Sequence, residues 1–224
     1  MPKVALLFCL CEVAYIAAVR VFLANFHGDP VAVELGWTAI RCASILALLW
    51  LLKQSGGRFG ALRKSDWSAV LAASLFLLAP VLVAADRLGS PLNHVYAATS
   101  LVVGLREELA YRGLLQRLLS DRFGFWPALL IATLCFTLFH IGVQPPEAYT
   151  FFQIAAAGLM LGLTYQLTRS IVAVAVLHAL YDIIYAYSPI LTPPFPEISG
   201  VLVFGVALLA LLLIYRTRTP SATR

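Results

Sequence analysis

The sequence "GLREELAYRG" (residues 104–113) places four ionisable side chains inside a long apolar stretch. They are Arg106, Glu107, Glu108 and Arg112, and all four lie within seven consecutive residues. A charged side chain at the centre of a bilayer costs about 2.5–3.5 kcal/mol on insertion scales. A membrane-buried stretch with four such residues therefore needs ion pairing, a function, or both.

The composition around this stretch is that of a polytopic helical membrane protein. Of the 224 residues, 61% are hydrophobic and 12% are charged, and the mean hydropathy is +0.88. Water-soluble domains of this size do not have such a composition. The chain contains eight apolar runs near the about 20 residues that cross a bilayer. We predict one domain over residues 1–224, an all-α bundle of about eight transmembrane helices. The predicted spans are 4–25, 31–52, 67–85, 94–119, 125–142, 148–167, 171–188 and 198–215.

The basic residues are distributed unevenly between the two ends of the predicted spans. Eleven of the sixteen lie at the N-terminus, in the even-numbered connections with their helix ends, or in the C-terminal tail. Only Arg87 lies on the opposite side. The positive-inside rule then predicts that both termini are cytoplasmic. The net charge of +5 reflects topology and not a nucleic-acid footprint, so the expected environment is the lipid bilayer.

Two histidines and an aspartate lie in other predicted spans, at a depth similar to that of Glu107. His140 is in the fifth span, and His178 and Asp182 are one turn apart on the seventh. Glu107 and His140 lie about 18 and 22 Å from the cytoplasmic ends of their helices, and His178 and Asp182 about 11 and 17 Å. Ionisable residues inside membranes face the bundle interior or a wet cavity. We therefore expect these four side chains to converge on one site.

The four charges of the opening stretch divide by helical spacing. Glu108 and Arg112 stand at i and i+4 with the acid first, which favours an ion pair on one face of the helix. Glu107 points about 100° away from Glu108 and is left for another task. The alternative is that all four charges form one network between helices.

A smaller motif concerns packing. The sequence "GLMLG" (158–162) has the spacing of two glycines that allows transmembrane helices to approach closely. The motif allows the sixth predicted span to pack closely on a neighbour through this face, but such spacing also occurs commonly by chance in membrane helices.

One glutamate, two histidines and an aspartate support two kinds of hydrolytic chemistry. A glutamate beside a neutral imidazole can deprotonate water, and a second histidine can donate to the oxyanion of a tetrahedral intermediate. Alternatively Glu107, His140 and His178 form a zinc site, although the helical HExxH signature is missing. A third possibility is a non-catalytic immunity or scaffold protein, or a proton-coupled transporter. The intact set of residues favours the enzyme, because transporters more often show repeats or broken helices.

Three motifs carry a resemblance to a known family. "EELAYR" (107–112) fits EExxxR, "FTLFH" (136–140) fits FxxxH, and "HALYD" (178–182) fits Hxxx[ND]. In this order, on the fourth, fifth and seventh predicted helices, they resemble the CPBP family. This is the CAAX protease and bacteriocin-processing (Abi) family, which includes the Ras-converting prenyl endopeptidase. The resemblance implies an intramembrane endopeptidase, in which Glu108 and Arg112 support the site.

The resemblance also implies a role for each member of the site. Glu107 would activate water together with His140, while His178 and Asp182 would form the oxyanion side. The family has been described both as metalloproteases and as glutamic-type proteases. We favour the form that requires no cofactor, with zinc held by Glu107, His140 and His178 as the alternative.

One departure from the family concerns the last motif. The prenyl-protein enzymes typically carry asparagine where this chain has Asp182, and an ionised aspartate cannot donate to an oxyanion. Asp182 would then be protonated, orient His178, or ligate a metal. The aspartate weakens the case for a prenylated substrate. We expect a prokaryotic-style enzyme of the inner membrane that acts on a leader peptide, a C-terminal sorting helix or a lipidated tail.

Overall fold

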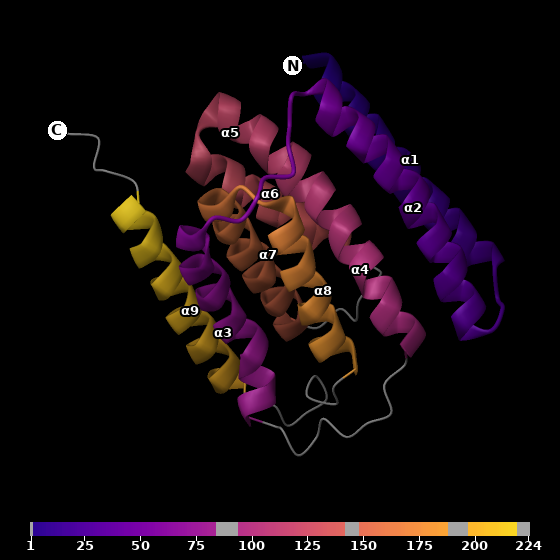
Figure 1. Ribbon diagram of the computed structural model, residues 1–224. Helices are drawn as coiled ribbons and strands as arrows, with labels where there is room; N and C mark the ends of the chain where they lie inside the picture. The colour runs from indigo at the N-terminus through magenta and orange to yellow at the C-terminus, as the bar shows by residue number, and fades with distance from the viewer. Residues whose placement is uncertain (1, 84–93, 142–147, 188–196, 219–224) are drawn as a thin grey trace.

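The computed structural model describes residues 2–83, 94–141, 148–187 and 197–218, and most of these residues are helical (Figure 1). The predicted all-α class is confirmed, whereas Arg87 lies outside the described residues. The elements, in chain order, are α1 (Pro2–Asn25), α2 (Pro30–Gln54), the 3₁₀-helix η1 (Lys64–Asp66), α3 (Trp67–Val83), α4 (His94–Glu108), the π-helix η3 (Leu109–Gln116), α5 (Arg117–Phe123), α6 (Phe125–Phe139), α7 (Ala148–Thr168), α8 (Ile171–Tyr187) and α9 (Glu197–Arg218).

Each predicted span coincides with helix to within a few residues, and the predicted ends at residues 85, 142 and 188 lie outside the described residues. The fourth span is a continuous helix over 94–123, formed by α4, η3 and α5, and not 94–119. The fifth span was predicted over 125–142 because the apolar run continues past Phe139, but α6 ends at Phe139. A helix end at this point makes His140 a cap residue rather than a helical one.

Four of the described helices are individually long and apolar enough to cross a membrane. They contain the segments Lys3–Asn25, Pro30–Gln54, Phe151–Thr168 and Val201–Arg218. In Figure 1, α1 begins and α9 ends at the same end of the bundle, drawn at the top. The number of crossings and the cytoplasmic location of the termini remain predictions.

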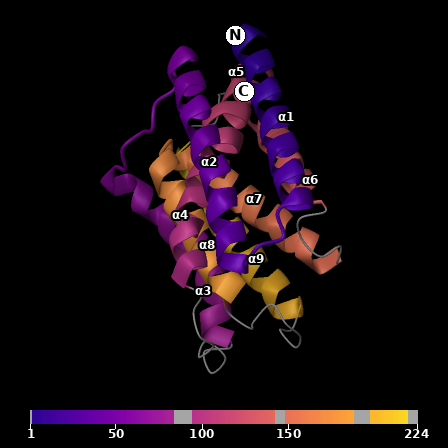
Figure 2. The same ribbon diagram turned by 90° about the vertical axis from the view of Figure 1, so that its right-hand side faces the viewer.

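The helices are arranged around the pair α4 and α8, which lie against each other. The opposite side of α4 contacts α2, and α2 packs on α1, so these two form one edge of the bundle (Figures 1 and 2). At the other edge, α3 packs on α9, and α7 contacts both α6 and α8. The fully buried apolar side chains lie between these layers, among them Leu48, Leu51, Leu109, Leu114 and Leu163.

The close approach that the two glycines of α7 allow is observed. A Cβ atom at Gly162 would overlap a methyl group of Leu129 on α6, so a side chain at this position would displace Leu129. Because glycine has no side chain, the backbone carbonyl groups of Gly158 and Gly162 can also accept hydrogen bonds from η3. Arg112 Nη2 donates to the carbonyl of Gly158, and Gln116 Nε2 donates to that of Gly162, each at 3.0 Å. The glycine face therefore ties α7 both to α6 and to η3.

Replacing Gly162 with leucine is expected to lower the stability of the chain by about 1–3 kcal/mol, because a large side chain must push α6 away from α7. Thermal unfolding in detergent measures the change. Gly205→Leu is the matched control, since a Cβ at Gly205 on α9 meets no atom within 4 Å. Equal unfolding temperatures for the two variants would show that the contact between α6 and α7 is not tight.

Candidate active site

The opening stretch lies at the junction of α4 and a π-helix. α4 ends at Glu108, and η3 continues the same helix over Leu109–Gln116 with the wider π spacing. Short π segments inside α-helices frequently occur at functional sites. Glu107 is 6% exposed and Glu108 is fully buried, so both carboxylates lie inside the bundle.

Glu108 Oε1 accepts hydrogen bonds from two different side chains. Arg112 Nη1 donates at 2.9 Å, which forms the ion pair that the spacing predicts. His178 Nδ1 donates to the same oxygen at 2.8 Å, from α8. Glu108 therefore joins the two central helices and fixes the ring of His178. Orienting His178 was one of three roles that the sequence left open for Asp182.

Glu107 faces two histidines that come from two other parts of the chain. Its Oε2 lies 4.0 Å from His140 Nε2 and 3.9 Å from His178 Nε2. Both distances are too long for direct hydrogen bonds and short enough for one bridging water. Among the described residues, no hydrogen-bond partner exists for this buried oxygen. Glu107, for which helical spacing predicted no ion-pair partner, is therefore the carboxylate that faces both imidazoles.

His140 owes its orientation to the end of α6. It follows the last helical residue directly, and its Nδ1 lies 2.8 Å from the carbonyl oxygen of Phe136. Because a carbonyl can only accept, the proton of a neutral His140 ring sits on Nδ1. The unprotonated Nε2 then faces Glu107. This arrangement suits an imidazole that takes part in proton transfer.

Asp182 lies one turn beyond His178 on α8, at the more open side of the site. Its Oδ1 is 3.7 Å from His178 Nε2, and its side chain is 25% exposed, compared with 5% for His178. The structure thus brings together all four residues for which the sequence predicted convergence, with His178 in the middle.

Phe136 connects the members of the site by packing. Its ring centroid lies 4.6 Å from Arg112 Cζ, 4.9 Å from the His140 ring and 5.7 Å from the His178 ring. The edge of His178 meets it at 69°. Phe136 is the first residue of the FxxxH motif, and no role could be assigned to it from the sequence. The Phe136 ring packs against the Arg112 guanidinium and both imidazole rings, which accounts for an aromatic residue at this position of the motif.

Arg106 takes no part in this arrangement. Its Nη2 donates to both carboxylate oxygens of Glu12 on α1, each at 2.7 Å, and its guanidinium lies 3.6 Å from the ring centroid of Tyr15. The four charges of the opening stretch are thus divided between an α1 contact, a support pair and Glu107, and do not form one network. The only sequence signal for the α1 contact was that Glu12 interrupts an apolar span.

The fit of this site to a metal ion can be judged from its donor atoms. The described residues contain no group of three or more His, Cys, Asp or Glu side chains placed to hold one metal ion. As placed, Glu107, His140 and His178 do not form a ligand set, although their donor atoms face one another. In the zinc alternative these three residues would still be the ones to hold the ion, and the two mechanisms call for the direct test described below.

Comparison with known proteins confirms the resemblance carried by the motifs. Residues 89–184 match the family model described as type II CAAX prenyl endopeptidase Rce1-like. This segment contains all three motifs, from Glu107 to Asp182. No curated protein matches the chain significantly. The matched family is described as endopeptidases, so this central segment of the chain is similar to a protease family.

Proposed function

We propose that this chain, whose central segment is similar to the CAAX prenyl endopeptidases, is a glutamic-type intramembrane endopeptidase. One observation carries the proposal. A buried carboxylate oxygen of Glu107, without a hydrogen-bond partner among the described residues, faces the Nε2 atoms of His140 and His178 at about equal distances. Glu108 Oε2 is likewise buried without a partner among the described residues, so the two facing imidazoles, and not the missing partner alone, distinguish Glu107.

Water activation falls to Glu107 and His140. A water bound between Glu107 Oε2 and His140 Nε2 can hydrogen-bond to both groups at the observed separation. Glu107 removes a proton from it, and the resulting hydroxide attacks the carbonyl carbon of the substrate peptide bond. The same proton then passes to the leaving amine, so that one water is consumed for each acid and amine released.

Stabilisation of the oxyanion falls to His178. Its Nδ1 donates to Glu108, so a ring that also donates from Nε2 is an imidazolium. Glu107 and Asp182 both lie on the Nε2 side, and their negative charges favour this cation before substrate binds. A pre-positioned cationic donor of this kind lowers the free energy of the tetrahedral intermediate. Asp182, the more exposed carboxylate, would support the positive charge of His178, whose ring is oriented by Glu108.

The substrate class follows from the depth of the site. Glu107, Glu108 and His178 are buried among helices, so the scissile bond has to enter the bundle. We propose that the substrate is a membrane-associated protein or peptide, such as a leader peptide, a C-terminal sorting helix or a lipidated tail.

The test is cleavage of membrane-anchored peptide reporters by the purified chain, before and after chelation, with the metal content measured on the same sample. We expect cleavage that survives chelation in protein with far less than one metal per chain. Stoichiometric zinc, with activity lost on chelation and restored by zinc, would instead make Glu107, His140 and His178 ligands. No cleavage of any reporter by folded protein would favour the non-catalytic immunity, scaffold or transporter alternatives.

A further inference from the structure

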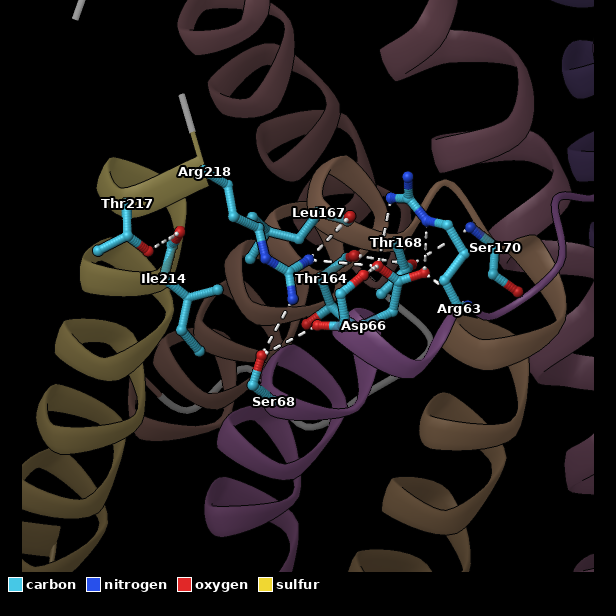
Figure 3. Close-up of polar contacts among 11 residues, drawn as sticks. Arg63, Asp66, Ser68, Thr164, Leu167, Thr168, Ser170, Ile214, Thr217 and Arg218 are labelled. Atoms are coloured by element: carbon cyan, nitrogen blue, oxygen red, sulfur yellow. Dashed lines mark hydrogen bonds and ion pairs between the residues drawn. The ribbon is translucent and has the colours of Figure 1, made fainter. Parts of the chain in front are cut away.

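Two arginines that are far apart in the sequence, Arg63 and Arg218, share one buried carboxylate at the end of the bundle where α3 begins and α9 ends (Figure 3). Asp66 is the last residue of η1 and is fully buried. It accepts hydrogen bonds from the backbone amide of Arg63 at 2.8 Å and from the Arg63 guanidinium at 3.3 Å. Arg218 Nη1, from the end of α9, donates to the same carboxylate at 3.3 Å.

The arginines are held in place by several elements. Arg218 Nη2 donates to Ser68 Oγ at 3.0 Å, and Nη1 also reaches the carbonyl of Leu167 at 3.4 Å. The guanidinium is therefore fixed by α3 and α7 as well as by η1. Figure 3 shows the third guanidinium nitrogen of Arg63 directed away from Asp66, out of the network. Such fixed donors lose little conformational entropy when they bind a ligand.

The cluster carries excess positive charge. Burial would raise the pKa of Asp66, but hydrogen bonds from Arg63 and the charges of Arg63 and Arg218 outweigh this effect and lower the pKa below its ordinary value. The carboxylate is thus ionised near neutral pH, and two guanidiniums face one negative charge. The Arg63 side chain is 70% exposed and that of Arg218 is 26% exposed, so an anion can reach both.

Immediately beyond this cluster lies an exposed apolar face. Trp67 follows Asp66 directly and is 53% exposed, and Leu71 and Leu75 continue the same stripe of α3 at spacings of four residues. On α9, which packs against α3, Leu209 and Leu213 are also exposed. An indole at the start of a membrane helix is typical of the bilayer interface. The two guanidiniums suit the phosphate headgroup of a phospholipid, and the adjoining apolar stripe suits its acyl chains.

We propose that Arg63 and Arg218 bind the phosphate of an anionic glycerophospholipid whose acyl chains lie along the Trp67 side of α3. Guanidinium groups suit phosphate because their fixed N–H donors match its oxygens. Basic pockets at the ends of transmembrane helices bind anionic headgroups in the same way. The site shares no residue with the Glu107 site, and its occupancy does not depend on whether the chain is a protease.

Binding of single lipids to the detergent-solubilised chain, followed by native mass spectrometry, tests the proposal. We expect phosphatidylglycerol to bind at least about tenfold more tightly than phosphatidylcholine with the same acyl chains. Arg63→Gln should remove most of this preference, while Arg63→Lys should retain part of it. Arg122→Gln, which removes an exposed charge at the end of α5, should leave it nearly unchanged.

Three results would overturn the proposal. Equal binding of the two lipids by the wild-type chain would show that the headgroup charge is not recognised, whatever the variants do. An equal loss for Arg63→Gln and Arg122→Gln would indicate a general charge effect. Displacement of phosphatidylglycerol by an equal concentration of inorganic phosphate would indicate a site for free anions, in which the α3 stripe has no part.

Discussion

Replacing Glu107 with glutamine is expected to lower peptide cleavage at least about a hundredfold, while the chain stays as stable as the wild type. The amide cannot accept a proton from water, so the proposed base is lost. Stability should be kept because Glu107 Oε2 has no hydrogen-bond partner among the described residues. Initial cleavage rates and thermal unfolding, both in the same detergent, measure the two effects separately.

The neighbouring residue provides the matched comparison. Glu108→Gln makes the same chemical change one position along, but Glu108 accepts hydrogen bonds from both Arg112 and His178. Removing its charge leaves the Arg112 guanidinium buried without a counter-ion, which costs about 3–5 kcal/mol in comparable pairs. We therefore expect Glu108→Gln to lower the unfolding temperature as well as cleavage.

The contrast between the two variants is the critical result. If Glu107→Gln retained full cleavage, Glu107 would not be the base. If both variants lost stability to the same extent, Glu107 would be part of the supporting network. In that case the distinction between a support pair and an unpaired glutamate would be wrong.

The parts of the site that sequence could predict are those that depend on local helical geometry. Glu108 and Arg112, four residues apart, form the expected pair, and His178 and Asp182 share a face of α8 as expected. Convergence with His140 followed from depth, because membrane thickness limits where a buried charge can lie. These inferences needed only the rise of a helix and the cost of burying charge.

The parts that sequence could not predict depend on contacts between helices. Nothing in the spacing of Glu12 and Arg106, 94 residues apart, indicates that they meet. The π-helix after Glu108 was also not expected, since the apolar run continues through it without a change of composition. The sequence also did not predict that His178 would hydrogen-bond to Glu108 instead of to Asp182. Each of these features is decided by how closely α4 approaches its neighbours.

The closest of these approaches involves Gly104, one turn before Glu107 and Glu108. A Cβ atom at Gly104 would lie 2.6 Å from the carbonyl oxygen of Ala175 and 3.1 Å from the amide nitrogen of Ala179. These are backbone atoms of α8, on either side of His178, and cannot rotate away as a side chain could. Any larger residue therefore has to move α8 itself. Gly104 thus sets the distance between the carboxylates of α4 and the imidazole of His178.

We expect Gly104→Ala to reduce kcat for cleavage about a hundredfold, since a displacement of about 1 Å at a reacting group has an effect of this size. Stability should fall by about 1–3 kcal/mol because the helices are forced apart. Gly205→Ala on α9, where added atoms meet nothing, should change neither quantity appreciably. Gly162→Leu separates a structural effect from a positional one, because it disturbs α6 and α7 on the other side of η3. If Gly162→Leu and Gly104→Ala lost stability equally and also lost cleavage equally, the effect would be general loosening of the bundle. A selective loss in Gly104→Ala would show that the spacing between α4 and α8 determines activity.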